Sequence, residues 1–170
     1  MSKFKISDLN SFDTSPFRLI GKEHMLITAA KGDKANTMTA SWGGLGVIWG
    51  QPAAYIVIRP QRYTKEFVDA ADCFSLSFLG AGHRQPLAYL GSVSGRDEDK
   101  ITKSGLTLAY EDGVPFFEES HATLICKKAY GQYLEKDCFI EKQHLEKWYP
   151  ESDLHMLYIG IVEKLLIKEQ

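Results

Sequence analysis

Hydroxyl side chains and glycines are concentrated in residues 36–46, which read Asn-Thr-Met-Thr-Ala-Ser-Trp-Gly-Gly-Leu-Gly. Thr37, Thr39 and Ser41 have the two-residue spacing of a strand, which is predicted to run directly into a glycine-rich turn. Small side chains leave backbone N–H and C=O groups accessible, and glycine lets the chain pass close to a flat ligand. The stretch therefore favours contact with a planar molecule that has a polar edge. Taken alone, it is more typical of a β-hairpin whose hydroxyls face water.

A cationic segment begins at Arg59 and reads Arg-Pro-Gln-Arg-Tyr-Thr. It ends an apolar run and opens a helical one, and free amides at the start of a helix favour an anion. Arg59 and Arg62 would supply forked donors that match phosphate oxygens, and Thr64 a hydroxyl beside the same amides. The segment predicts a phosphate site, although it lacks the spacing of a P-loop. The alternative is a surface loop whose arginines pair with Glu66 or Asp69.

The composition narrows the class of protein. The chain has 170 residues, of which 44% are hydrophobic and 25% charged, as in an ordinary globular domain. The formal net charge of −2 gives no broad attraction to nucleic acid or anionic lipid, and no apolar stretch approaches the ~20 residues that span a bilayer. The N-terminus lacks the apolar core of a signal peptide, so we expect a cytoplasmic protein. The cysteines and histidines have no disulfide-framework or metal-ligand spacing: Cys73, Cys126, Cys138, His24, His83, His121, His144 and His155.

Short apolar segments predict strands. Phe74, Leu76 and Phe78 alternate with smaller residues, which is typical of a half-buried strand. Ala53–Ile58 is more continuously apolar, which favours a strand buried on both faces. The remaining predicted strands are Met25–Ala30, Thr37–Trp42, Ala122–Lys127 and Leu154–Ile167, with a turn at Lys31–Asn36 between the first two.

Helical patterns are fewer and shorter. Thr64 is predicted to cap a helix that runs to about Ala71. Many strands with few helices favour a mainly β structure, a barrel with short helical insertions rather than a doubly wound sheet. We expect one domain over residues 1–170, since no linker or repeat divides the chain. Two further helices are predicted to end before a glycine: Arg84–Leu90 before Gly91, and Asp97–Ser104 before Gly105.

Further motifs follow the hydroxyl-rich stretch and the cationic segment, or lie between them, along the chain. They are Trp49-Gly50-Gln51-Pro52, then Ser-Gly-Arg-Asp-x-Asp-Lys at residues 94–100, then Trp148-Tyr149-Pro150, Asp153, His155 and Tyr158-Ile159-Gly160. On these motifs, from Phe17 to Ile167, the chain resembles the flavin reductase-like family of FMN-binding split β-barrels. Flavoredoxin-type proteins are the most similar branch. The resemblance implies a Greek-key-like split barrel.

The resemblance also implies a cofactor site. FMN would lie in a cleft at the interface of a homodimer. The hydroxyl-rich strand would meet the isoalloxazine ring and the ribityl chain, the cationic segment would hold the phosphate, and the Ser-Gly-Arg turn would line the same pocket. The residues implied to bind FMN are Asn36, Met38, Thr39, Ala40, Ser41, Trp42, Arg59, Arg62, Tyr63, Thr64, Ser94 and Lys100.

The function implied is that of an oxidoreductase that cycles bound FMN, with electrons from NAD(P)H or from a protein donor. No GxGxxG motif marks a separate nicotinamide domain, so NAD(P)H would bind transiently over the flavin. The resemblance implies no catalytic acid or base. Trp148 could cover the flavin ring, but a tryptophan is more often a packing residue. His155 is more typical of a hydrogen-bonded structural residue than of a proton donor.

Three alternatives stay open. The first is an FMN-carrying electron-transfer protein without small-molecule turnover, which would exchange electrons with a redox partner protein. The second is a non-catalytic binding module on the same barrel. The third is the related pyridoxamine phosphate oxidase type, which the Ser-Gly-Arg-Asp-x-Asp-Lys and Trp-Tyr-Pro motifs disfavour.

Overall fold

The computed structural model describes residues 3–169, so residues 1, 2 and 170 of the predicted domain lie outside the described part. The structure is mainly β, as predicted. Its strands are β1 Phe4–Ser7, β2 Met25–Lys31, β3 Lys34–Ala40, β4 Gly43–Ile48, β5 Gln51–Ile58, β6 Cys73–Phe78, β7 Leu108–Glu111, β8 Val114–Phe117, β9 Ala122–Tyr133 and β10 Met156–Lys168. Its α-helices are α1 Pro16–Gly21, α2 Tyr63–Ala70, α3 Arg84–Ser92, α4 Lys100–Ser104 and α5 Lys142–Trp148.

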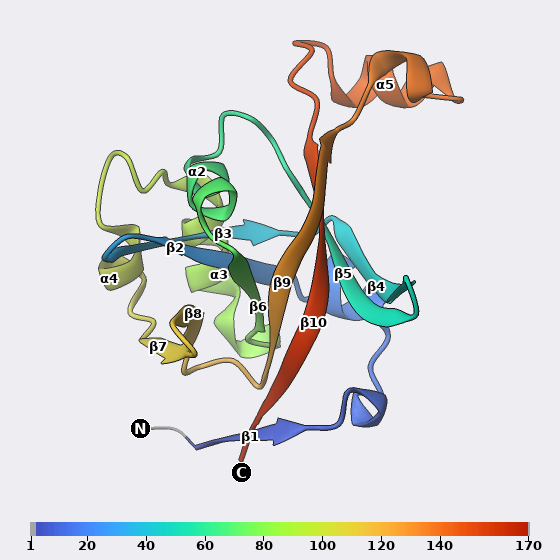
Figure 1. The fold of residues 1–170 in the computed structure, drawn as a ribbon. Coiled ribbons are helices and arrows are strands. Elements are labelled where there is room, and N and C mark those ends of the chain that lie inside the picture. The colour runs from blue at the N-terminus through green and yellow to red at the C-terminus, as the bar shows by residue number, and fades with distance from the viewer. Residues whose placement is uncertain (1–2, 170) are drawn as a thin grey trace.

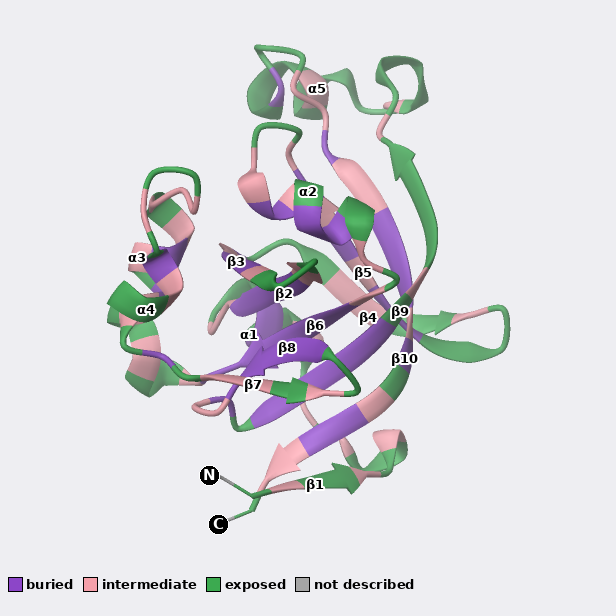
Figure 2. Ribbon diagram, turned by 60° about the vertical axis from the view of Figure 1, so that its left-hand side comes forward, coloured by how far each residue is buried: buried purple, intermediate pink, exposed green. Residues whose placement is uncertain are grey.

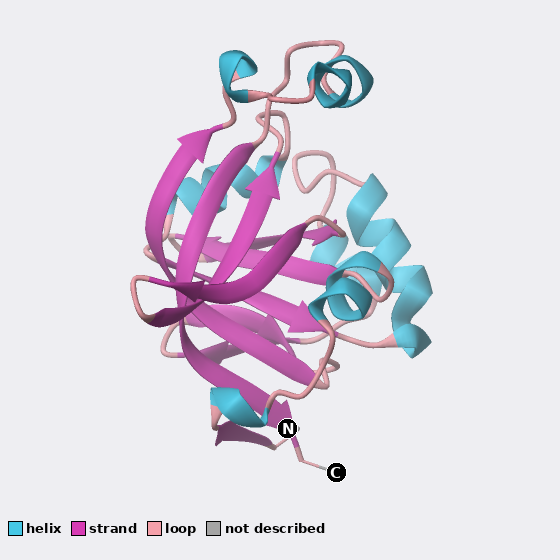
Figure 3. Cartoon of the chain, turned by 90° about the vertical axis from the view of Figure 1, so that its right-hand side faces the viewer, coloured by secondary structure: helices cyan, strands magenta, loops and turns pink. Residues whose placement is uncertain are grey.

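One antiparallel sheet forms the barrel, in the order β3-β2-β6-β9-β10-β5-β4. The first part of β10 pairs with β5 and its last part with β1, while β9 follows its other edge. Register shifts between β9 and β10 add local twist, which helps a sheet to curl. Figure 3 shows the strands wrapped round one interior, with helices on the outside, several of them on the right of the view. The described edge strands β3 and β4 follow each other in the chain without pairing, so the barrel is split there.

The loop between β9 and β10 leaves the barrel. Residues 134–155, called here the α5 arm, include the helix α5. Figure 1 shows this arm standing beyond the end of the two long strands, away from the body of the sheet. In the described part of the chain, no helix is long and apolar enough to cross a membrane.

The core lies inside the curled sheet, where Figure 2 shows the buried segments of the central strands. The phenylalanines and the leucine of β6 have no exposed surface, as the alternation predicted for that face. The prediction of a half-buried strand was nevertheless wrong, because Ser75 and Ser77 are buried too. The β7–β8 hairpin covers their face, and Ser75 Oγ donates to the Pro115 carbonyl over 2.6 Å. In β5, Tyr55 and Val57 stay partly exposed, so the predicted burial on both faces is incomplete.

Helix ends differ from the predicted ones. Thr64 does not cap α2: Arg62 is the capping residue, without a side-chain bond, and Thr64 lies within the first turn. Helix α3 continues through Gly91 to Ser92, because Gly91 does not adopt the left-handed conformation that ends a helix and packs instead against Thr39 of β3. Helix α4 begins later than predicted, but it ends at Gly105 in the left-handed conformation, as expected (φ 75°).

The glycine-rich segment forms a strand rather than a turn. β4 pairs with β5 over its whole length, and the turn between β2 and β3 is shorter than predicted because β3 begins at Lys34. Gly43 opens β4 with φ 147°, and an added Cβ would lie 2.4 Å from the Tyr55 carbonyl oxygen. Only glycine allows the two backbones to approach this closely at the split in the barrel.

Candidate functional site

The hydroxyl-rich strand and the cationic segment are in direct contact. Asn36 is buried on β3, and its Nδ2 donates to Oγ1 of the buried Thr64 on α2 over 2.9 Å. The fold allows this contact because α2 packs over β2 and β3, with β3 at the edge of the sheet. The two sequence stretches that were predicted to share one site therefore meet.

A pocket of about 110 Å³ opens beside this contact. It is called here the α2–α3 pocket, because residues 61–64 at the start of α2 and residues 91–94 at the end of α3 form its walls. Five of the predicted cofactor residues line it: Arg62, Tyr63, Thr64, Ser94 and Lys100.

Lys100 is the buried cation of this pocket, with 3% of its surface exposed. Its Nζ donates to the carbonyls of Leu90 and Val93 at the end of α3, over 3.0 and 2.9 Å. Burial, and secondly the positive charge of Arg62, lower the pKa of Lys100 to about 8. Burial also lowers the pKa of the Arg62 guanidinium. Each group would hold its charge more firmly if an anion lay beside it.

The carboxylates near these two cations are engaged elsewhere. Glu66 accepts from Arg96, and Asp69 pairs with Lys65, so neither neutralises Arg62 as the surface-loop alternative required. Among residues 3–169, Arg62 and Lys100 have no salt bridge to a carboxylate. Two neighbouring cations without a countercharge favour the binding of an anion.

The Ser-Gly-Arg turn closes one side of the α2–α3 pocket. An added Cβ on Gly95 would lie 2.3 Å from Asn36 Oδ1, so this glycine lets the turn pack against β3. The Arg96 guanidinium lies over the Tyr63 ring, 4.6 Å from its centre, and donates to the Gln61 carbonyl. The turn thus packs against β3 through Gly95 and is bound to the start of α2 through Arg96.

An aromatic hollow of about 200 Å³ adjoins the α2–α3 pocket through Arg62, which lines both. The rings of Trp42 and Trp148 meet edge to face, with centres 5.0 Å apart, and the Trp42 and His155 rings are 5.2 Å apart. We call this hollow the tryptophan pocket. It is lined by Met38, Thr39, Ala40, Ser41, Trp42, Val57, Arg59, Arg62, Trp148 and His155.

Arg59 attaches the α5 arm to the barrel. Its guanidinium donates to the Asp153 carboxylate and to the Trp148 carbonyl, and it lies 5.1 Å from the centre of the Tyr149 ring. Arg59 was predicted to hold the phosphate together with Arg62. The structure brings it into the tryptophan pocket and not into the walls of the α2–α3 pocket.

His155 is neutral over the physiological pH range. Burial, and secondly the charge of Arg59, lower its pKa to about 4. Its Nδ1 lies 2.8 Å from the Tyr149 hydroxyl, whose own pKa is raised mainly by burial. This hydrogen bond fits the structural interpretation of His155, although its ring also faces the tryptophan pocket.

The predicted residues at the end of β3 and just after it line the tryptophan pocket and not the α2–α3 pocket. Met38 and Ala40 are buried, Ser41 is exposed, and Thr39 Oγ1 donates to the Leu87 carbonyl of α3 over 2.5 Å. In the described residues no cluster of His, Cys, Asp or Glu could hold a metal ion. Burial raises the pKa of Cys126, which makes that thiol unreactive at neutral pH.

Sequence reasoning missed several groups of the site. Asp153 orients Arg59, and Gln61 donates to the same carboxylate over 2.8 Å. Asp153 and Gln61 both belong to the motifs described above, and their polar side chains could have indicated a role in the site. The carbonyls of Leu90 and Val93 that hold Lys100 had no such signal, because every residue has a backbone carbonyl.

Known proteins share this fold. A structure described as an FMN-binding domain of a flavin reductases-like enzyme from Shewanella baltica OS155 superposes with a TM-score of 0.71 at 20% identity, covering 98% of this chain and 78% of that one. Flavoredoxin from Methanosarcina acetivorans gives 0.67 at 23%, covering 100% and 77%. The NADH:FAD oxidoreductase SgcE6 of Streptomyces globisporus gives 0.63 at 18%, covering 86% and 80%. The predicted split β-barrel is confirmed.

Sequence comparison gives the family. The protein YddH of Escherichia coli (strain K12) is 30% identical over 99 residues, which are 56% of this chain and 52% of YddH. The alignment thus spans about half the length of that relative. The sequence model of the flavin reductase-like domain matches residues 17–169, nearly the range over which the motifs were found. The chain belongs to the flavin reductase-like domain family.

Proposed function

We propose that the chain binds FMN, with the phosphate in the α2–α3 pocket and the ring in the tryptophan pocket. The observation that carries the proposal is the pair of cations, Arg62 and Lys100, which have no carboxylate partner within residues 3–169. A phosphate dianion would supply the missing charge. Arg62 lines both pockets, so one molecule can reach from one to the other.

The chemistry of the tryptophan pocket fits a flavin ring. Trp42, Trp148 and His155 present aromatic faces and edges to a flat molecule. β3 is an edge strand, so the backbone groups of its outer edge are left unpaired by the sheet and suit the polar edge of the ring. We propose the cofactor role for all the residues that the resemblance implied, with Arg59 acting through its hold on the α5 arm.

We further propose that the protein is an oxidoreductase that takes electrons from NAD(P)H or from a protein donor. FMN supplies the electron transfer when bound, while the chain binds, orients and shields it. His155 is uncharged at neutral pH, so we assign it no proton donation. NAD(P)H as the reductant has support from the similarity to SgcE6, whose structure is described in complex with NAD and FAD fragments.

A second candidate is an FMN-carrying electron-transfer protein, which the similarity to flavoredoxin favours. The test begins with the absorbance spectrum of the purified protein, followed by anaerobic titration with NADH and NADPH. Stoichiometric bleaching by either nucleotide supports the oxidoreductase. A bound flavin that neither nucleotide reduces excludes NAD(P)H as the donor, leaves a protein donor and so supports the electron-transfer protein. A protein that binds no FMN contradicts both.

We propose a homodimer of single-domain chains, each domain formed by residues 1–170. Large apolar side chains are exposed on the α5 arm and the β4–β5 hairpin: Ile140 at 98%, Val47 at 71%, Trp49 at 58% and Trp148 at 41%. A second copy would cover them and the adjoining tryptophan pocket. Light scattering of flavin-loaded protein should give twice the mass of the 19.2 kDa chain, and the mass of one chain would contradict the proposal.

A further inference from the structure

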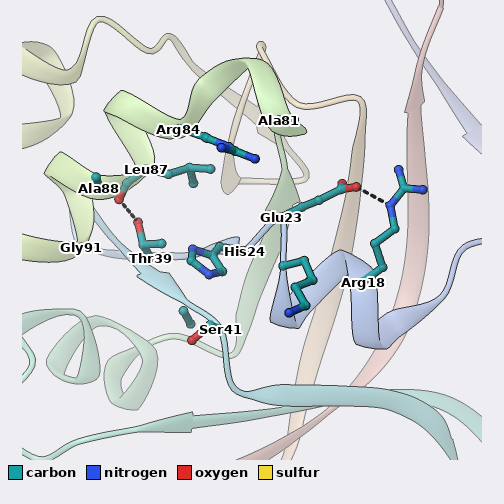
Figure 4. A pocket seen from close by; sticks show the side chains of 12 residues that line it. Arg18, Glu23, His24, Thr39, Ser41, Ala81, Arg84, Leu87, Ala88 and Gly91 are labelled. Carbon is teal, nitrogen blue, oxygen red and sulfur yellow. Dashed lines mark hydrogen bonds and ion pairs between the residues drawn. The ribbon is translucent and has the colours of Figure 1, made fainter.

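We propose that the cavity between α1 and α3 binds the anionic end of a small molecule whose other end reaches the flavin, a compound that carries a phosphate or a carboxylate. The inference rests on the proposed function, because it places the flavin ring in the adjoining tryptophan pocket. The cavity measures about 830 Å³, within the range of small-molecule sites. It is called here the α1–α3 cavity, and Figure 4 shows its lining.

The charge of the lining is unbalanced. Arg18, Lys22 and Arg84 line the cavity together with a single carboxylate, Glu23. Arg18 Nε and Glu23 Oε1 pair with each other over 2.7 Å, the contact dashed in Figure 4. Lys22 and Arg84 have no side-chain hydrogen bond or ion pair with another described residue between 3 and 169. Two free cations remain, and they favour an oxyanion.

The α1–α3 cavity is bounded by α3 and β3, which pack closely together, and small residues leave space inside it. Thr39 Oγ1 donates to the Leu87 carbonyl, which fixes α3 against β3. On α3 the cavity is lined by Arg84, Leu87, Ala88 and Gly91, and Ala81 lines it just before the helix, so small residues at three of these positions leave space. A Cβ on Gly91 would lie 3.3 Å from Thr39 Cβ, so the helix already packs closely on the strand. The hydrogen bond and this close packing hold α3 and β3 together on one side of the cavity.

The α1–α3 cavity adjoins the tryptophan pocket at the end of β3. Thr39, Ala40 and Ser41 line both. Figure 4 shows Arg84 and Ser41 at opposite ends of the hollow, with His24 and Thr39 between them. A molecule whose anion lies at Arg84 and Lys22 can therefore extend past β3 to the flavin ring. The anion could be a phosphate of a nucleotide or the carboxylate of an organic acid.

The test uses the FMN-loaded protein and two redox-inert probes, ADP-ribose for a nucleotide phosphate and 4-hydroxybenzoate for a carboxylate. Calorimetry measures the dissociation constant of each probe for the wild type, for Lys22→Ala/Arg84→Ala, and for the matched variant Lys5→Ala/Lys127→Ala. The matched variant loses the same charge at exposed sites outside the cavity. A fourth protein, Ala88→Phe, fills the cavity without a change of charge.

We expect at least one probe to bind the wild type. Its dissociation constant should rise tenfold or more for Lys22→Ala/Arg84→Ala and for Ala88→Phe, and should stay within twofold of the wild-type value for the matched variant. Binding of ADP-ribose alone identifies a nucleotide, and binding of 4-hydroxybenzoate alone an organic acid. The inference is overturned if neither probe binds, or if the cavity variants bind like the matched one. FMN content, read by absorbance in the same samples, separates this outcome from failure of the proposed function, in which the wild type itself holds no FMN.

Discussion

Asn36 on β3 donates to the buried hydroxyl of Thr64 on α2, and this contact joins the strand that would meet the flavin ring to the helix that would hold its phosphate. The bond links residues 28 positions apart in the chain. Removing one partner of a buried hydrogen bond costs stability, because the remaining polar group is bonded neither to water nor to protein. The relative position of the two pockets therefore depends on it.

A double-mutant cycle tests the coupling between these two side chains. Asn36→Ala should lower the free energy of unfolding by about 1–3 kcal/mol, since it leaves a buried hydroxyl without its donor. Thr64→Ala added to Asn36→Ala should cost much less than it does alone. Urea unfolding of the four proteins, without FMN, measures the energies. Additive effects would mean that the contact does not hold β3 and α2 together.

Gly95→Ala should weaken FMN binding more than it weakens the fold. The new Cβ would lie 2.3 Å from Asn36 Oδ1 and 3.2 Å from the Tyr63 ring, so the Ser-Gly-Arg turn must move away from the α2–α3 pocket. Gly21→Ala is the matched control, because its Cβ meets nothing within 4 Å. Flavin fluorescence titration should show a loss of affinity of tenfold or more for Gly95→Ala only. Equal affinities in the two variants would remove the turn from the site.

FMN binding should weaken as the pH rises above about 8. In the free protein the pKa of Lys100 is lowered to about 8, and a bound phosphate would raise it. The affinity for FMN is therefore complete below the pKa of the free protein and falls as the pH rises from that value toward the higher pKa of the complex. The measurement is the ratio of FMN to riboflavin affinity from pH 7 to 9.5. Lys100→Met should bind FMN weakly at every pH with a flat ratio, and a flat ratio in the wild type would contradict the role of this lysine.

His155 should make the folded state sensitive to mild acid. Its pKa is about 4 when folded and near 6.5 when unfolded, so the unfolded chain binds more protons between these values. The contribution of His155 to stability is present above pH 6.5 and is lost as the pH falls toward 4. The fall in urea midpoint between pH 7.5 and pH 5 should be smaller for His155→Asn than for the wild type. Equal falls would show that this histidine is not held neutral.

The sequence predicted the strands that have a strong apolar pattern, and it predicted that the two polar stretches lie together, as the Asn36–Thr64 hydrogen bond shows. It missed β4, because the glycines of Gly43–Ile48 suggest a turn, whereas pairing with β5 and close approach to Tyr55 decide the structure. It mistook the role of Thr64, because a hydroxyl at a helix start normally caps the helix, and here Asn36 binds it. Contacts between distant segments cannot be read from local patterns.

The same limit applied to the cations of the site. Arg59 and Arg62 look equivalent in the sequence, but Asp153 lies close enough only to Arg59, and only the fold reveals this. The α1–α3 cavity had no signal at all, since its cations lie in α1, α3 and the loop between α1 and β2 without a shared motif. Spacing in the sequence therefore indicated which side chains lie together better than it indicated the partner of each charge.

The most direct test of the account compares FMN with riboflavin, which lacks the phosphate. Fluorescence titration of flavin-free protein gives both dissociation constants for the wild type, for Arg62→Ala and for the exposed control Lys127→Ala. Loss of a charge-assisted bond costs about 1.5–3 kcal/mol, so Arg62→Ala should bind FMN roughly tenfold or more weakly, with riboflavin and the control almost unchanged. An equal loss for both flavins, or no loss for FMN, would contradict a phosphate held between Arg62 and Lys100.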